Sequence, residues 1–122
     1  MLTDNDIARL AAEIRSAIAP IVIGTFGSYA VGTAKDGSDL DLFVIAETTA
    51  PPRSVARSIR RHLFGVMHPL DIHVFRPEEF EEEAAEYLSF AWVIARQARI
   101  YYAASDAEPK LPSLFPPQPR SD

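Results

Sequence analysis

Apolar side chains near the N-terminus recur with the 3.6-residue period of an α-helix. Between residues 6 and 18 these positions are Ile7, Leu10, Ala11, Ile14, Ala17 and Ile18. Capping candidates precede them at residues 3–6, and Pro20 ends the pattern. The sequence therefore predicts a first helix over residues 6–18 with one buried face.

Short apolar runs between turn-forming residues predict the strands of a small sheet. These runs cover residues 21–23, residues 39–45 and residues 70–75. Residues 100–102, with the sequence Ile-Tyr-Tyr, are a candidate for a short final strand. Helical periodicity returns at residues 51–64, and residues 78–98 predict two helices or one bent helix. The order helix, strand, loop, strand, helix, strand, helices indicates an α/β or α+β domain.

The length of 122 residues suits a single domain. Half of the ten prolines fall within residues 105–122. We therefore expect a folded domain over residues 1–104, followed by a Pro-rich, flexible C-terminal tail over residues 105–122.

Composition narrows the function further. The chain has no cysteine, which excludes disulfides, thiolate nucleophiles and cysteine-ligated zinc. Its net charge of -5 argues against a large basic groove for extended nucleic acid. The acidic start and the lack of an apolar run of about 20 residues predict a cytoplasmic protein that does not enter the membrane.

Three aspartates are the strongest candidates for chemistry. Asp39 and Asp41 stand at i and i+2 on the second predicted strand, so both project from one face. Asp71 opens the third strand, and the three carboxylates converge if the two strands are neighbours with aligned ends. Two carboxylates about 5 Å apart repel by roughly 3 kcal/mol at an effective dielectric near 20. A pair of Mg²⁺ ions, or Mn²⁺, would balance such a cluster and serve phosphoryl transfer.

A turn that suits phosphate lies just upstream of these aspartates. Gly27 and Ser28 follow the first strand and precede a segment able to start a helical turn. Glycine lets the backbone approach a bulky anion, and N–H groups at a helix start point toward phosphate.

Gly27-Ser28, ten intervening residues and Asp39-Leu40-Asp41 match the Gly-Ser-x10-Asp-x-Asp signature. The chain thereby resembles the DNA polymerase β-like nucleotidyltransferase superfamily, and within it the minimal nucleotidyltransferase branch. Asp71 stands where the third family carboxylate falls. Tyr29 occupies a position that is often basic in the branch. The resemblance implies the nucleotidyltransferase fold, a small mixed β-sheet flanked by helices.

The resemblance also implies an activity and its residues. Asp39, Asp41 and Asp71 would hold two Mg²⁺ ions and act as the catalytic carboxylates, with Asp71 as candidate general base. Gly27 and Ser28 would bind the phosphates of ATP or another nucleoside triphosphate. Members of the branch are often antitoxins that attach AMP to a tyrosine of a helical HEPN-type toxin. The expected partners are thus a nucleoside triphosphate and either such a protein or a second copy of the chain.

Two other functions stay open at this stage. One is a non-catalytic module that neutralises a partner by docking, and the other is a transferase acting on a small molecule such as an antibiotic. It is also open whether His73 acts near the acceptor, and whether the arginines between Arg53 and Arg61 meet the triphosphate or an acidic partner. A structural or surface histidine and a solvated helix face are the simpler explanations.

Overall fold

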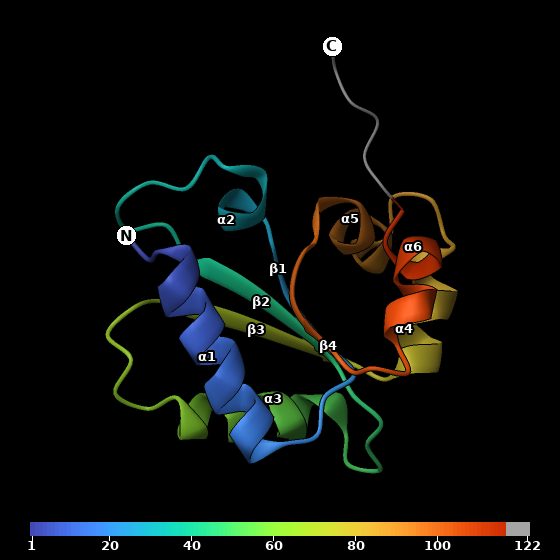
Figure 1. Cartoon of the computed structure of the whole chain (residues 1–122), viewed down its shortest axis with the longest axis horizontal. Coiled ribbons are helices and arrows are strands. Elements are labelled where there is room, and N and C mark those ends of the chain that lie inside the picture. The colour runs from blue at the N-terminus through green and yellow to red at the C-terminus, as the bar shows by residue number, and fades with distance from the viewer. Residues whose placement is uncertain (117–122) are drawn as a thin grey trace.

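Four strands form one mixed sheet in the computed structural model, which describes residues 1–116 (Figure 1). The strands are β1 (Val22–Phe26), β2 (Leu40–Ile45), β3 (Leu70–Phe75) and β4 (Arg99–Ala103), in the spatial order β3-β2-β1-β4. β1 is antiparallel to both β2 and β4, whereas β2 and β3 are parallel. The predicted small mixed sheet is therefore confirmed.

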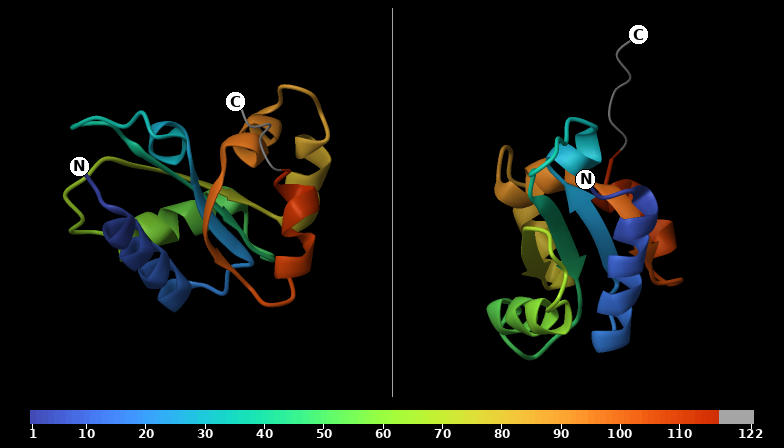
Figure 2. Two further views of the ribbon diagram at one scale, coloured as in Figure 1. Left: turned by 45° about the horizontal axis from the view of Figure 1, so that its top comes forward. Right: turned by 90° about the vertical axis from the view of Figure 1, so that its left-hand side faces the viewer.

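Helices cover both faces of this sheet. α1 (Asp4–Ala17) and α3 (Pro52–His62) pack on one face, and α4 (Pro77–Ala84) and α5 (Phe90–Gln97) on the other (Figures 1 and 2). α3 is the crossover that joins the parallel strands β2 and β3, a connection that needs a dozen or more residues. It begins at the proline pair, where a missing N–H costs the helix nothing.

The alternation of side chains along β2 divides the core in two. Leu40, Leu42 and Val44 face α1 and α3, while Phe43 and Ile45 face α4 and α5. Since Asp41 has the same parity as Phe43, its side chain lies on the α4 and α5 face. The alternation therefore decides which face carries the carboxylates.

The N-terminal helix begins two residues earlier than expected. Thr3 accepts a hydrogen bond from the Asp6 N–H at 3.1 Å, and the Asp6 carboxylate accepts one from the Thr3 N–H at 2.8 Å. This capping box draws Asp4 and Asn5 into the first turn. The hydrogen bond to the Thr3 backbone, followed by that to its side chain, lowers the pKa of Asp6.

The structure differs from the flexible segment predicted after residue 104. A 3₁₀ turn, η1 (Glu108–Lys110), leads into the short helix α6 (Leu111–Leu114). The Phe115 ring then packs 5.5 Å from the rings of both Phe43 and Phe80. Prolines near the start of η1 and α6 are compatible with helix there, which is why their abundance misled the prediction. The remainder of the predicted tail, residues 117–122, lies outside the described residues.

In residues 1–116, no helix has both the length and the apolar character required to cross a membrane.

Candidate active site

The register of the sheet brings the predicted carboxylates to one end. Asp41 and Asp71 are directly paired across the parallel strands β2 and β3, and Asp41 also lies opposite Phe26 at the end of β1. Asp39 is exposed and immediately precedes β2, two residues from Asp41. The alignment of strand ends on which the three-carboxylate prediction depended is therefore present.

The glycine–serine turn lies against the same carboxylates. Gly27 caps α2 (Ser28–Val31) with φ 71° and ψ -153°, a conformation that an L side chain rarely adopts. A Cβ atom at Gly27 would overlap Oδ2 of Asp41. The Gly27 N–H donates to Oε1 of Gln97, from the end of α5, at 3.0 Å. Glycine is thus required here both by the backbone conformation and by the close approach of Asp41.

The electrostatics of Asp41 reflect this crowding. Burial raises the pKa of the Asp41 carboxyl, and the negative charges of Asp71 and Asp39 raise it further, opposed by His73. A divalent cation would reverse the effect of the two neighbouring charges. Carboxylate oxygens on a half-buried strand end are also the ligands that Mg²⁺ and Mn²⁺ prefer, so these residues fit such an ion.

Asp71 is at present engaged by two other side chains. Its Oδ2 lies 2.9 Å from Nε2 of His73, and its Oδ1 lies 4.0 Å from Nη2 of Arg60. Within residues 1–116, no three acidic or histidine side chains lie close enough together to hold a metal ion. An ion that used all three aspartates would therefore require their side chains to rearrange.

An aromatic cluster forms the wall beside His73. The rings of Phe26 and Phe90 lie 5.5 Å and 4.9 Å from the His73 ring, and 5.5 Å from each other. His73 consequently has a structural role, as one of the sequence interpretations had it, and at the same time it hydrogen-bonds Asp71.

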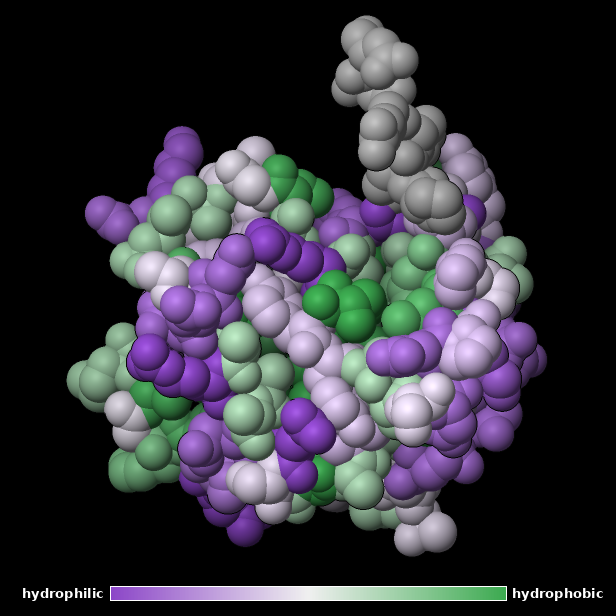
Figure 3. All heavy atoms as spheres, viewed as in Figure 1, coloured by the Kyte–Doolittle hydropathy of each residue, from purple (hydrophilic) through white to green (hydrophobic). Residues whose placement is uncertain are grey.

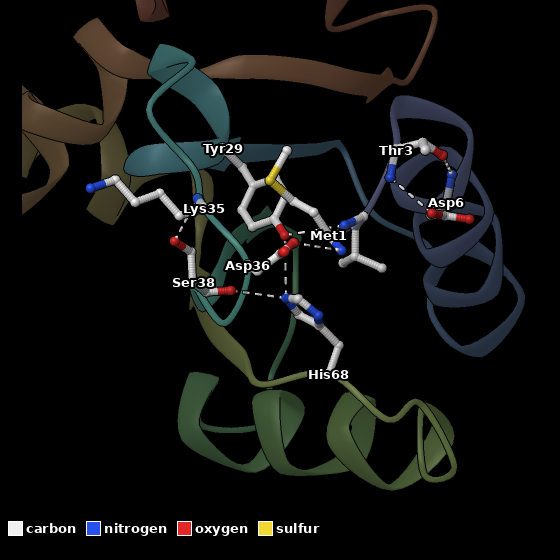
Figure 4. Close-up of polar contacts among 9 residues, drawn as sticks. Met1, Thr3, Asp6, Tyr29, Lys35, Asp36, Ser38 and His68 are labelled. Carbon is white, nitrogen blue, oxygen red and sulfur yellow. Dashed lines mark hydrogen bonds and ion pairs between the residues drawn. The ribbon is translucent and has the colours of Figure 1, made fainter.

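A second set of contacts fixes the loop that precedes Asp39 (Figure 4). His68 Nε2 lies 2.9 Å from the carbonyl oxygen of Ser38, and the Tyr29 hydroxyl lies 3.5 Å from the same nitrogen. The Tyr29 hydroxyl also accepts from the Leu2 N–H at 3.2 Å. Tyr29, which stands where a basic residue is common in the branch, thus ties α2 to the N-terminus and to the loop that carries Asp39.

Comparison with known proteins identifies the family of this fold. The sequence pattern of the family described as Nucleotidyltransferase domain matches residues 7–115. The chain belongs to this nucleotidyltransferase family. The family is one of enzymes, and the observed fold is the nucleotidyltransferase fold. No curated protein is matched by the sequence.

Solved structures of similar fold come from toxin–antitoxin complexes. One, a toxin–antitoxin with AMP-PNP, has 21% identity over 90% of this chain and 81% of the matched chain, with a TM-score of 0.56. A second, the MntA–HpeT complex with two aspartates changed to glutamate, has 19% identity over 90% and 81% of the two chains and a TM-score of 0.56. A third, an MntA–HpeT complex with a tyrosine changed to alanine, has 19% identity over 93% and 84% and a TM-score of 0.55.

Sequence reasoning missed Gln97 and His68. Gln97 lies 70 residues from the Gly27 amide that it accepts from, and His68 lies 30 residues from the Ser38 carbonyl. Neither residue belongs to a local motif whose spacing reveals its contact. Arg60 was expected on a solvated helix face, and it is indeed exposed, but it also approaches Asp71.

Proposed function

We propose that the chain transfers AMP from ATP to the hydroxyl group of a protein acceptor. Asp39 and Asp41 would hold two Mg²⁺ ions, and Asp71 would complete the set. Gly27 and Ser28 would bind the β- and γ-phosphates. Bound Mg²⁺ would supply positive charge to the triphosphate and the leaving pyrophosphate.

The contact between Gly27 and Asp41 carries this proposal. It joins a phosphate-binding turn to a carboxylate cluster with no intervening side chain, so a triphosphate at the turn would reach the cluster. The Gln97 side chain holds the Gly27 amide and so fixes the turn. A positioned turn lowers the cost of orienting the nucleotide for attack.

The balance of the reaction assigns a role to Asp71. The acceptor oxygen forms a bond to the α-phosphorus, the bond from that phosphorus to the bridging oxygen breaks, and pyrophosphate leaves. Asp71 accepts the acceptor's proton, and its hydrogen bond with His73 at 2.9 Å keeps the carboxylate at the edge of the sheet.

The proposed acceptor is a tyrosine of a HEPN-type toxin. The structural relatives support it, because they are toxin–antitoxin complexes and one of them contains AMP-PNP, an ATP analogue. A tyrosine-to-alanine variant of one complex exists as well. At this identity the likeness establishes the fold, and the acceptor is our proposal.

The test is transfer of label from α-³²P-ATP to the protein encoded by the neighbouring reading frame. The wild type is compared with Asp41→Asn, which keeps the shape of the side chain and removes its charge. Asp36→Asn is the matched control, since Asp36 is exposed and lies in the loop before the site. We expect a loss of 100-fold or more (on the order of 3 kcal/mol of transition-state stabilisation) for Asp41→Asn only, and complete loss with EDTA. Equal labelling by both variants would remove Asp41 from the site.

One observation favours a second candidate, a docking module without transferase activity. Asp71 is paired with His73 and Arg60, and within residues 1–116 no three acidic or histidine side chains lie close enough together to hold a metal ion. Under that function, the double variant Asp39→Ala/Asp41→Ala would still neutralise a toxic partner, and no label would pass from ATP to it.

A further inference from the structure

One edge of the sheet is unpaired beside the site. β3 has β2 as its only neighbour in residues 1–116. The carbonyl of Phe75 accepts from the Ala46 N–H at 3.0 Å, so Phe75 directs its backbone groups toward β2. Because this direction alternates along a strand, Ile72 and Val74 direct their N–H and C=O groups away from the sheet. In the described part of the chain, nothing accepts from or donates to these outward groups.

A groove follows this edge. It has a volume of about 580 Å³, and residues 71–75 form its floor. α3 supplies one wall with Arg53 and Arg60, and Phe90 at the start of α5 supplies the other. The Phe90 side chain is 45% exposed although it packs on His73, so it presents an apolar surface to whatever enters. Asp71 lies at the end of the groove that adjoins the carboxylate cluster.

The charged side chains of the α3 wall are all positive. The helix contains four arginines and no acidic residue, whereas the whole chain has a net charge of -5. Arg53 forms no ion pair within residues 1–116, and Arg60 has a single one, with Asp71 at 4.0 Å. A negatively charged occupant would find both guanidinium groups available.

We propose that an extended, acidic segment of a partner protein adds to β3 as a further strand and so brings its hydroxyl to Asp71. The inference rests on the proposed function for what the hydroxyl does there, but not for the docking itself. Alternating outward donors and acceptors match a peptide backbone, which has the same alternation. The phosphates of a nucleic-acid strand are acceptors only, so they would leave the outward carbonyls of Ile72 and Val74 without donors.

The docking is tested by amide hydrogen exchange without nucleotide or Mg²⁺. The probe is a glutamate–tyrosine copolymer, with a lysine–tyrosine copolymer and polyuridylate as matched controls. The Ile72 and Val74 amides should exchange fast in the free protein and become about tenfold slower with the acidic probe alone. Slowing by the lysine copolymer or by polyuridylate to the same extent would overturn the proposal. So would slowing that depends on protein concentration without any probe, which would indicate a second copy of the chain.

A second exposed surface, the loop after α3, should show no protection from exchange in the same experiment. Apolar atoms gather at the left edge of Figure 3, where the loop after α3 lies, and Phe64 and Met67 in this loop are 93% and 96% exposed. Protection confined to residues 64–67 would overturn the edge-strand site.

Two pairs of variants separate the backbone from the charge contribution. Val74→Pro removes the outward N–H and is tolerated on an edge strand, while Val74→Ala shortens the side chain and keeps the N–H. We expect about fivefold weaker probe binding for Val74→Pro relative to Val74→Ala. Arg53→Glu should weaken binding about tenfold at low salt, and Arg57→Glu, exposed on the same helix but outside the groove, should not. Equal effects of Val74→Pro and Val74→Ala would show that the backbone N–H does not contribute to binding. Equal effects of Arg53→Glu and Arg57→Glu would show the same for the charge of the groove.

Failure of the docking and failure of the proposed function give different results. Asp41→Asn should bind the probe as the wild type does, because Asp41 lies outside the groove. If the probe still binds but no label passes from ATP to any hydroxyl, the proposed transferase activity is wrong and the docking site stands. If label passes to a protein acceptor and Val74→Pro and Arg53→Glu leave that transfer unchanged, the transferase activity stands and the docking site is wrong.

Discussion

At the scale of single residues, Gly27 is the position in the candidate site where a side chain is least tolerated. Its φ of 71° disfavours any side chain, and a Cβ would overlap Asp41. Gly27→Ala should therefore lower the free energy of unfolding by about 2 kcal/mol and abolish transfer. Gly37→Ala is the matched control, because Gly37 has φ 87° and no atom lies within 4 Å of the place that its new methyl group would take. Urea denaturation and the label assay measure both, and equal losses for the two variants would contradict a specific role of the Asp41 contact.

The charge on Asp41 should cost stability while it serves function. Its pKa is raised above the ordinary value of 3.8, so between these two values the folded state binds more protons than the unfolded chain. Stability from this group is therefore greatest below pH 3.8 and falls as the pH rises through the raised pKa. Asp41→Asn should melt at a higher temperature than the wild type at pH 7, with the gap closing at low pH. Melting curves without metal check this, and an unchanged or lowered melting temperature at pH 7 would contradict it.

At the scale of elements, the loop before Asp39 depends on residues from three other segments. His68→Ala removes the contact to the Ser38 carbonyl, 2.9 Å away. We expect a loss of about 1 kcal/mol in stability and a higher Mg²⁺ concentration for half-maximal transfer, with partial rescue by His68→Gln. His62→Ala is the control, since His62 contacts Ser16 and Glu13 away from the site. A fall in stability without any change in the Mg²⁺ requirement would leave His68 a purely structural residue.

The elements themselves were largely predictable from the sequence. Periodicity located α1, α3 and the strands β2 and β3 to within a few residues, because each buries one face or a short apolar run. Register was not predictable: the pairing of Asp41 with Asp71 depends on how α3 returns the chain to the sheet, and periodicity does not encode that. The η1 and α6 segment was missed because proline abundance is ambiguous between loop and helix start.

At the scale of the whole molecule, the packing that stabilises the fold and the residues of the candidate site occupy different parts of one sheet face. α6 and Phe115 cover the middle of the face on which Asp41 lies, through Phe43 and Phe80, whereas the turn and the aspartates lie at its end. Phe115→Ala should therefore reduce the free energy of unfolding by about 2 kcal/mol and leave label transfer at 25 °C unchanged. Phe64→Ala, the same deletion at a side chain that is 93% exposed, should have almost no effect on stability. If Phe115→Ala abolished transfer in a protein that remains folded, the C-terminal segment would belong to the active site, because its packing on Phe43 would then reach Asp41 two residues along β2.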